Sequence, residues 1–300
     1  MPLPVTFVQV VGVERITPRM ARITFEAESL AESVGCAPDQ QVKLCFPRAG
    51  QEEPVLPAQD DDPMSWYQAY LAIPEAERPW MRSFTLRRRR PGTRALEVDF
   101  VLHGDTGPAS AWAARALPGD RLGMVGPSDL YARPVPLGAA VAGADWVLLA
   151  GDETALPAAG TLLEALPAGT PAVAFLEVAD AAERQSFDTR ADLTVHWLHR
   201  DGVAPGGRLT EAVRSAGLPG GTAFAWLAGE ASAVRALRRH LVGERGWAKA
   251  SVEFAGYWRH RLTQDDAPTA EDLADAQEML AQAQVEAQAG GDGGDGGDGG

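Results

Sequence analysis

Two stretches decide the fold of this chain: Arg82-Ser83-Phe84-Thr85, and some twenty residues later His103-Gly104-Asp105-Thr106-Gly107-Pro108-Ala109-Ser110-Ala111-Trp112. The first offers a permanent cation and a flat ring on a predicted strand. The second follows an apolar alternation typical of a strand and runs into a predicted helix over residues 111–117. Glycine-rich backbone at a helix N-terminus presents unpaired N–H groups to an anion. This order of strand, turn and helix predicts a pyrophosphate site, as in a cradle for flavin dinucleotide.

Arg82 to Thr85 would serve both ends of such a cofactor. Arg82 keeps its proton at any ordinary pH and can bind two phosphate oxygens, so we expect it to be the counter-ion of the pyrophosphate. The ring of Phe84 would pack beside the flavin. Thr85 has a hydroxyl and an N–H that reach the isoalloxazine edge, where hydrogen bonds tune the redox potential. Ser83, between Arg82 and Phe84, is a further candidate contact of the cofactor.

The turn at the start of the following helix is expected to hold the second phosphate. Its candidate residues are Gly107, Pro108, Ala109 and Ser110, with Trp112 one turn further on. Proline fits there because the first helical turn needs no amide from it. His103 ends the preceding strand, where it is either a structural residue or a contact of the flavin.

The spacing of apolar residues divides the chain into two domains. Residues 5–130 contain short strands separated by Gly and Pro, which predicts a small antiparallel barrel of six strands. From Trp146 onward, apolar strands alternate with helical stretches, a pattern typical of a parallel sheet covered by helices. We therefore expect a β-barrel domain in residues 1–132 and an α/β domain in residues 133–262. A helical extension (263–289) and a disordered Gly/Asp tail (290–300) would follow.

Length and composition agree with a two-domain cytoplasmic protein. A chain of 300 residues exceeds one typical domain. The longest apolar runs fall short of the roughly 20 residues of a membrane span, and no secretory signal is recognisable, so we expect no membrane partner. Two cysteines, Cys36 and Cys45, are too few for an iron–sulfur cluster or structural zinc. In the cytoplasm we expect two reduced thiols rather than a disulfide.

The net charge of −14 is concentrated at the C-terminus. Ten of the 41 acidic residues, and none of the 27 Lys and Arg residues, follow residue 262, so the preceding part carries only −4. Nucleic-acid binding depends on clustered cations, and this chain is acidic, so we expect no nucleic-acid partner. An insertion over residues 47–81 is acidic first and aromatic afterwards. It is either a surface excursion with one short helix packed by its aromatics, or a lid over the cofactor.

Six segments, taken in order, resemble the siderophore-interacting proteins, a flavoprotein family of the ferredoxin-NADP reductase superfamily. They are Arg82 to Thr85, the His103 to Trp112 loop, Pro118-Gly119-Asp120 with Gly126-Pro127, Ala150 to Pro157, Ala228-Gly229-Glu230, and Gly256-Tyr257-Trp258-Arg259. The resemblance extends from Phe7 to about Arg261. It implies FAD as cofactor. Phe84 stands where the family more often has Tyr, so the ring remains and a hydrogen bond worth about 1 kcal/mol is lost.

The resemblance also places a donor site in the second domain. Gly151 to Pro157 follows a buried strand and opens a helix, where reductases of this superfamily bind a nicotinamide dinucleotide. Gly151, Asp152 and Thr154 are candidates there, and Glu177 could accept from a ribose diol, which would favour NADH over NADPH. Asp152 would nevertheless repel phosphate at a helix N-terminus. Tyr257 and Trp258 complete the candidate cofactor contacts.

Basic residues near the flavin are candidates for binding an anionic ferric siderophore. We choose Lys43, on a barrel strand, and Arg259, in the last family segment. Three arginines share a predicted helix face that is either merely solvated or receives a phosphate or an acidic carrier such as ferredoxin: Arg235, Arg238 and Arg239. His196 and His199 would face opposite sides of a strand, so we expect no metal site.

The implied function is oxidoreductase chemistry, in which a ferric-siderophore reductase uses FAD to pass electrons from NADH, NADPH or ferredoxin to Fe(III). Oxygen donors hold Fe(III) better than Fe(II), so reduction loosens the complex. No protein acid, base or nucleophile is required, because the flavin supplies the chemistry. Two alternatives stay open: a flavin reductase or quinone-type NAD(P)H oxidoreductase, and a non-enzymatic siderophore-binding protein.

Overall fold

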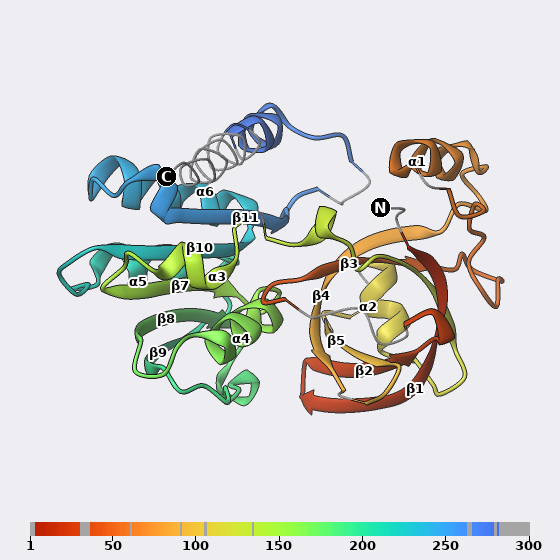
Figure 1. Cartoon of the computed structure of the whole chain (residues 1–300), viewed down its shortest axis with the longest axis horizontal. Helices are drawn as coiled ribbons and strands as arrows, with labels where there is room; N and C mark the ends of the chain where they lie inside the picture. Colours follow the sequence, from red (N-terminus) through yellow and green to blue (C-terminus); the bar gives the residue numbers. More distant parts are fainter. Residues whose placement is uncertain are drawn as a thin grey trace, which may run out of the picture.

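The computed structural model describes residues 4–30, 37–60, 62–90, 92–104, 107–133, 135–262, 266–278 and 281. It contains a closed β-barrel and a parallel sheet covered by helices, which lie side by side in Figure 1. Both predicted architectures are confirmed. The expected boundary at residue 132 falls in the segment that joins them.

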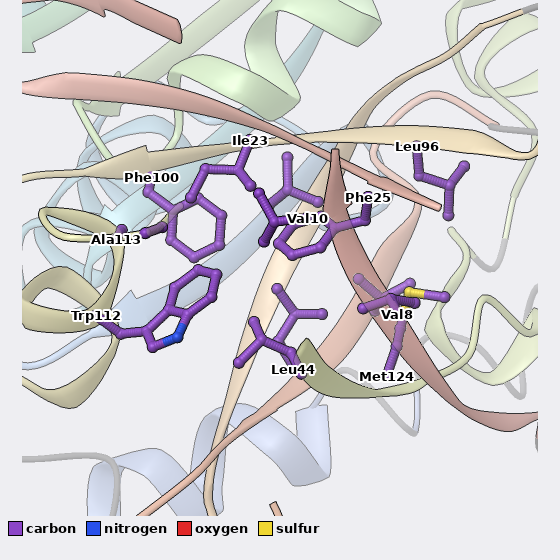
Figure 2. Close-up of a cluster of buried hydrophobic side chains, with 14 of the residues drawn as sticks. Val8, Val10, Ile23, Phe25, Leu44, Leu96, Phe100, Trp112, Ala113 and Met124 are labelled. Atoms are coloured by element: carbon purple, nitrogen blue, oxygen red, sulfur yellow. The ribbon is translucent and has the colours of Figure 1, made fainter. Parts of the chain in front are cut away.

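Six antiparallel strands close the barrel in the order β1-β2-β5-β4-β3-β6. They are β1 (Val5–Thr17), β2 (Met20–Glu26), β3 (Gln41–Phe46), β4 (Trp80–Arg89), β5 (Ala95–Val101) and β6 (Arg121–Val125). Alternate side chains point inward, as the two-residue period of a strand requires. Val8, Ile23, Leu44 and Phe100 are at most 1% exposed in this core, which Figure 2 shows.

A short helix, α2 (Pro108–Ala113), packs against β3, β4 and β5. The ring of Trp112 lies 6.2 Å from that of Phe25, 5.5 Å from that of Phe46 and 5.9 Å from that of Phe100, measured between centroids. Figure 2 shows Trp112 together with Phe25 and Phe100. The helix begins earlier than the predicted residue 111 because Pro108 occupies its first turn. The helix is therefore anchored through an aromatic cluster in the barrel core.

The second domain is a five-stranded parallel sheet with strand order β11-β10-β7-β8-β9. Its strands are β7 (Trp146–Asp152), β8 (Pro171–Val178), β9 (Asp192–His199), β10 (Ala223–Glu230) and β11 (Val252–Trp258). Its helices are α3 (Leu137–Val141), α4 (Leu156–Ala165), α5 (Gly207–Ser215) and α6 (Ala231–Arg239), the last continued by a π-helical turn at His240–Glu244. All of β7 is buried, as expected for a strand covered on both faces.

Polar contacts join the barrel to the sheet domain. α4 packs against β4, and the Arg87 guanidinium on β4 donates from Nη1 to Oε2 of Glu164 at 2.9 Å. The hydroxyl of Thr17 donates to Oε2 of Glu183 at 2.5 Å. Asp39, in the turn before β3, accepts from two side chains of the sheet domain. These contacts fix how the two halves face each other.

The insertion forms a helix, α1 (Pro63–Ala72), that begins at the N-cap residue Asp62. Its buried side chains Trp66 and Tyr70 pack with Cys45 and Val125 of the barrel. This arrangement agrees with the packed-helix interpretation of the insertion. Cys45 is a buried free thiol, and burial raises its pKa to about 12. Cys36 lies outside the described residues.

The predicted C-terminal helix is present over residues 270–278. It lies above α6 in Figure 1, where it is coloured dark blue. Thr269 caps it, since the Thr269 hydroxyl accepts from the N–H of Asp272 at 3.2 Å. Of the predicted extension and the Gly/Asp tail, residues 263–265, 279, 280 and 282–300 lie outside the described residues.

Candidate functional site

The cofactor segment predicted from the sequence lies on β4. Along this strand, Arg82 and Phe84 point to one side, and Ser83 and Thr85 to the other. The ring of Phe84 is half-buried, with its centroid 4.5 Å from that of Phe100. Ser83 is exposed, whereas Thr85 is 7% exposed. The segment therefore presents a ring and a cation on one face and two hydroxyls on the other.

Arg82 is held close to its own strand. Its Nη1 donates to the carbonyl oxygen of Met81 at 2.9 Å, and its guanidinium carbon lies 5.6 Å from the centroid of the Trp80 ring. The residue is partly exposed. A guanidinium that is oriented and still reaches solvent suits the bidentate recognition of phosphate.

The loop between β5 and α2 is closed by the hydroxyl of Ser110. This Oγ accepts from the N–H of His103 at 3.0 Å and donates to the carbonyl oxygen of Gly104 at 3.0 Å. Ser110 is 3% exposed. Its hydroxyl thus fastens the loop, which differs from the phosphate contact expected of it. The exposed residue His103 stands at the mouth of the loop.

Among the residues that the structure describes, none caps the N-terminus of α2 with its side chain. Its N-cap residue is Gly107, with φ −154° and ψ 150°, and a Cβ there would lie 3.6 Å from Cε1 of His103. Pro108 and Ala109 follow, both half-buried. Trp112, predicted as a cofactor contact, is 5% exposed and belongs to the barrel core, because the aromatic cluster described above surrounds it.

Lys43 lies next to the cofactor segment. It faces Ser83 across the β3–β4 pair, and its Nζ donates to Oγ of Ser83 at 3.1 Å. The same ammonium is 5.4 Å from the centroid of the Tyr131 ring. Burial lowers the pKa of Lys43. The structure thus brings this predicted substrate residue to the strand that carries Arg82.

At the carboxyl edge of the sheet, three strands have a buried carboxylate as their last or second-last residue. These are Asp152 on β7, Glu177 on β8 and Glu230 on β10, which are 1%, 0% and 5% exposed. Strand ends of this kind are where open parallel sheets usually bind ligands. Here each carboxylate is already satisfied by protein donors.

Asp152 accepts four hydrogen bonds. The donors are the N–H of Thr154 at 2.9 Å, its hydroxyl at 2.6 Å, the N–H of Glu230 at 2.8 Å and Nε1 of Trp258 at 2.8 Å. Burial raises the pKa of Asp152 to about 6, and the neighbouring Glu153 adds to the effect. Gly151 is required by packing, since a Cβ there would lie 2.7 Å from the carbonyl oxygen of Ala228.

Glu177 caps helix α5 instead of facing a ligand. Its Oε1 accepts from the N–H of Gly206 at 2.7 Å, and its Oε2 accepts from the N–H of Leu209 at 2.9 Å. This differs from the ribose contact expected of it, because both carboxylate oxygens are engaged and the side chain has no exposed surface. Glu230 does the same for α6, where it accepts from the N–H of Ala233 at 3.0 Å.

Tyr257 connects the sheet domain to the barrel domain through Asp39. Its hydroxyl donates to Oδ1 of Asp39, in the turn before β3, at 3.0 Å. Sequence reasoning missed Asp39, because an Asp in a turn before a strand is common and nothing around it signals burial. Its φ of 58° and an exposed fraction of 8% become evident only in the fold.

Arg259, the other predicted substrate residue, is engaged by the acidic C-terminal segment. Its Nη1 donates to Oδ2 of Asp272 at 2.9 Å and to the carbonyl oxygen of Ala267 at 3.1 Å, and Nη2 donates to that of Asp266 at 3.0 Å. The structure therefore does not bring Lys43 and Arg259 to a common partner. Lys43 contacts Ser83 in the barrel, and Arg259 pairs with Asp272 of the C-terminal segment.

The arginines of α6 are paired with the same segment. Arg235 donates to Asp275 at 2.9 Å, and Arg238 donates to Glu278 at 2.8 Å. Arg239 is exposed. Arg235 and Arg238 therefore form ion pairs with carboxylates of the chain itself. The sequence suggested either a solvated helix face or an external anion for these arginines.

The part of the chain that the structure describes has no group of three or more His, Cys, Asp or Glu that could hold a metal ion. In that same part, every helix is too short or too polar to span a bilayer.

Comparison with known families matches both domains. Residues 9–130 match the siderophore-interacting FAD-binding domain, and residues 144–261 match the siderophore-interacting protein model. The chain belongs to the siderophore-interacting protein family. The match to the FAD-binding domain covers β4, the loop before α2 and Lys43, so it includes the barrel residues among the predicted cofactor contacts.

Members of this family resemble the chain over most of its length. The ferric vibriobactin reductase ViuB of Vibrio cholerae is 31% identical over 81% of this chain and 85% of its own. The NADPH-dependent ferric-chelate reductase of Escherichia coli is 30% identical over 83% and 91%. A siderophore utilization protein from T. fusca, known as a crystal structure, superposes with a TM-score of 0.72 at 36% identity, covering 89% of this chain and 97% of that one.

Proposed function

We propose that this siderophore-interacting protein is an FAD-dependent reductase, active in the cytoplasm, that reduces Fe(III) in siderophore complexes and releases Fe(II). The observation that carries the proposal is the contact between Lys43 and Ser83, 3.1 Å from Nζ to Oγ. A cation suited to an anionic chelate thus stands beside the strand expected to hold the flavin. The names of the Vibrio and Escherichia relatives support the same activity.

The residues on and around β4 fit FAD. Arg82 is oriented and partly exposed, Phe84 has a half-buried ring, and α2 begins at an uncapped glycine. When bound, FAD accepts two electrons and can release them singly. Around it, Arg82 and the amides near Gly107 would neutralise the pyrophosphate, Phe84 and Thr85 would orient the isoalloxazine, and Lys43 would attract the chelate.

The electron donor is proposed to be NADH, NADPH or reduced ferredoxin. The carboxylates of Asp152, Glu177 and Glu230 occupy the strand ends of the sheet and accept from the backbone N–H groups there. They would repel a pyrophosphate. A nicotinamide dinucleotide would therefore need another position for its phosphates, and a protein donor would need none at this edge.

Anaerobic mixing of the flavin-loaded protein with each donor tests the donor, and steady-state assays test the acceptor. We expect flavin bleaching with at least one donor, followed by Fe(II) production from a ferric siderophore. Quinones and free flavin serve as competing acceptors. Faster turnover with quinones than with every ferric chelate would contradict the proposal in favour of a quinone-type oxidoreductase. A purified chain that retains siderophore but binds no flavin would show a binding protein instead.

A further inference from the structure

The ring of Trp80 is stacked against a guanidinium at the rim of the barrel. Trp80 is the first residue of β4, and the guanidinium carbon of Arg48, shortly after β3, lies 3.6 Å from the centroid of its ring. Both side chains are half-buried. The guanidinium carbon of Arg82 lies 5.6 Å from the same centroid. Two permanent cations therefore lie at one partly exposed aromatic ring, and the function proposed above uses only Arg82.

The insertion between β3 and β4 holds this pair in place. Nε of Arg48 donates to the carbonyl oxygen of Arg78 at 2.5 Å. The hydroxyl of Tyr70, on α1, donates to the carbonyl oxygen of Pro79 at 2.8 Å. The two residues before Trp80 are thus tied to Arg48 and to α1, so the fold orients both the ring and the guanidinium.

Trp80 begins a row of side chains on one face of β4. Trp80, Arg82 and Phe84 alternate along the strand and therefore share that face. Their partners across the β3–β4 pair all lie in the barrel core: Phe46, Leu44 and Val42. Two residues of an extended strand separate successive members of the row, which is about 7 Å. The row has the order ring, cation, ring.

FAD has its chemical groups in the same order. The isoalloxazine and the adenine are flat rings, and the negatively charged pyrophosphate lies between them. With the isoalloxazine at Phe84 and the pyrophosphate at Arg82, a cofactor extended along β4 brings its adenine to Trp80. Nucleic-acid bases stack on aromatic side chains of this kind. The charge of Arg48 beside the ring also attracts the nearby phosphate.

The edge of β4 beside this row is not occupied by another described strand. In the part of the chain that the structure describes, the register of β4 against β5 begins at Leu86. From Trp80 to Thr85, the described partners of β4 belong to β3. A cofactor extended along this stretch would therefore lie at a strand edge, where backbone groups are available to a ligand.

We propose that Trp80 binds the AMP half of FAD by stacking on its adenine, and that Arg48 is a positioning residue that holds the ring of Trp80 for this contact. Both roles rest on the FAD site proposed above and extend it to the other end of the cofactor. They make Trp80 a residue that distinguishes FAD from FMN, which has the isoalloxazine and one phosphate but no AMP. They also give the insertion a function, since it supplies Arg48 and supports Trp80.

Titration of the apoprotein with FAD and, separately, with FMN tests these roles, with flavin fluorescence as the signal. Trp80→Leu should raise the dissociation constant of FAD about tenfold, because it removes the stacking surface, and should leave that of FMN unchanged. Arg48→Gln should raise the FAD constant about threefold. Arg48→Lys should recover most of that loss, because a cation remains at the ring.

Phe7→Leu is the matched control. Phe7 lies on β1, is also half-buried, and has the guanidinium carbon of Arg121 at 4.8 Å from its ring centroid. In the barrel order, β2 and β5 separate β1 from β4 on one side, and β6 and β3 on the other. This variant removes a ring beside a guanidinium away from the proposed site, so both dissociation constants should match those of the parent.

The outcomes separate the AMP contact from flavin binding itself. An equal rise for FAD and FMN in Trp80→Leu, or an unchanged FAD constant, would overturn the proposal and leave the flavoprotein in place. A parent chain that binds neither flavin would contradict the proposed function instead. If the parent binds FAD but no measurable FMN, competition by ADP decides. ADP should displace FAD from the parent, and about tenfold less effectively from Trp80→Leu.

ADP that displaces FAD equally well from both proteins, or from neither, would overturn the proposal. Urea denaturation shows whether each variant folds. Should Trp80→Leu not fold, Arg48→Gln decides, since its guanidinium is replaced at the half-buried rim and the ring is kept. An FAD constant equal to that of the parent in this variant would then remove the pair from the cofactor site.

Discussion

The turn after β5 and the turn after β7 both lead from a buried strand into a helix that has proline in its first turn and no side-chain cap. In the barrel, this junction ends in exposed His103 and in Gly107, with Arg82 on a neighbouring strand. In the sheet, it ends in Asp152, which is 1% exposed and accepts four hydrogen bonds. The same backbone arrangement thus favours an anion in one domain and supplies its own anion in the other.

We infer from this difference that the barrel junction serves cofactor binding and that the sheet junction serves the stability of the fold. A helix N-terminus attracts negative charge in either domain. In the sheet domain, Glu177 and Glu230 meet that demand at α5 and α6. Asp152 accepts from the N–H of Thr154 in the turn before α4 and from the N–H of Glu230. In the barrel domain, no described side chain caps α2, and we expect a ligand to meet that demand. We therefore expect changes in the barrel site to affect FAD and changes at the sheet edge to affect folding.

The largest expected effect is on FAD affinity in Arg82→Ala. A hydrogen bond to a charged group contributes about 1.5–3 kcal/mol, so the dissociation constant of FAD should rise about tenfold to one-hundredfold. The apoprotein should keep the parent's unfolding midpoint. Titration of apoprotein with FAD, followed by flavin fluorescence, measures the change. Full affinity in this variant would remove Arg82 from the site.

The opposite pattern is expected for Asp152→Ala. Removing the carboxylate orphans the buried N–H of Glu230 and Nε1 of Trp258, which should lower the free energy of unfolding by about 2 kcal/mol. FAD affinity should change less than twofold, roughly, because no barrel residue is altered. Urea denaturation and the same FAD titration give both values. A variant that keeps its stability and loses FAD would reverse the assignment of the two regions.

The pH dependence of stability should distinguish the buried carboxyl group of Asp152 from an exposed one. The pKa of Asp152 is about 6 in the folded protein, above its unfolded value. Its contribution is therefore complete below the unfolded pKa and is lost as the pH rises through about 6. The difference in Tm between the parent and Asp152→Ala should shrink from about pH 4 to about pH 7. Hydrogen bonds from Thr222 lower the pKa of exposed Asp145, so Asp145→Asn should show no such shrinkage.

A smaller effect is expected on substrate capture. Lys43→Gln should raise the apparent KM for an anionic ferric chelate about fivefold at low salt, corresponding to about 1 kcal/mol, and reduce its salt dependence. Arg259→Gln should do less, because Asp272 already pairs with that guanidinium. Flavin reduction by the donor should stay unchanged in both. An equal or larger KM effect in Arg259→Gln would place the chelate at the sheet domain.

No effect is expected from deleting residues 290–300. A Gly/Asp segment has no apolar surface with which to dock on either domain. Flavin content and turnover should match the full chain, and absorbance spectra with Fe(II) assays measure both. A tenfold loss of turnover would assign the tail a role in the site.

The fold followed from the sequence because periodicity is local. The strand alternation and the strand-helix order of the second half predicted the barrel and the parallel sheet, and both are confirmed. Trp112 and Glu177 show where this reasoning ends. Their motif positions suggested ligand contacts, yet one packs in a core and the other caps a helix, because the decisive neighbours come from distant segments. Asp39 carried no sequence signal, since its partners Trp226 and Tyr257 lie some 190 and 220 residues away.

The central claim, that flavin held by the barrel delivers electrons to a ferric siderophore, is tested most directly by a single-turnover experiment. The flavin-loaded protein is reduced anaerobically by light, mixed with a ferric siderophore in a stopped-flow instrument, and followed by flavin absorbance and by an Fe(II) chelator. The account predicts flavin reoxidation together with about two Fe(II) for each flavin, because a reduced flavin carries two electrons. A flavin that stays reduced, or that reoxidises without Fe(II), would contradict it.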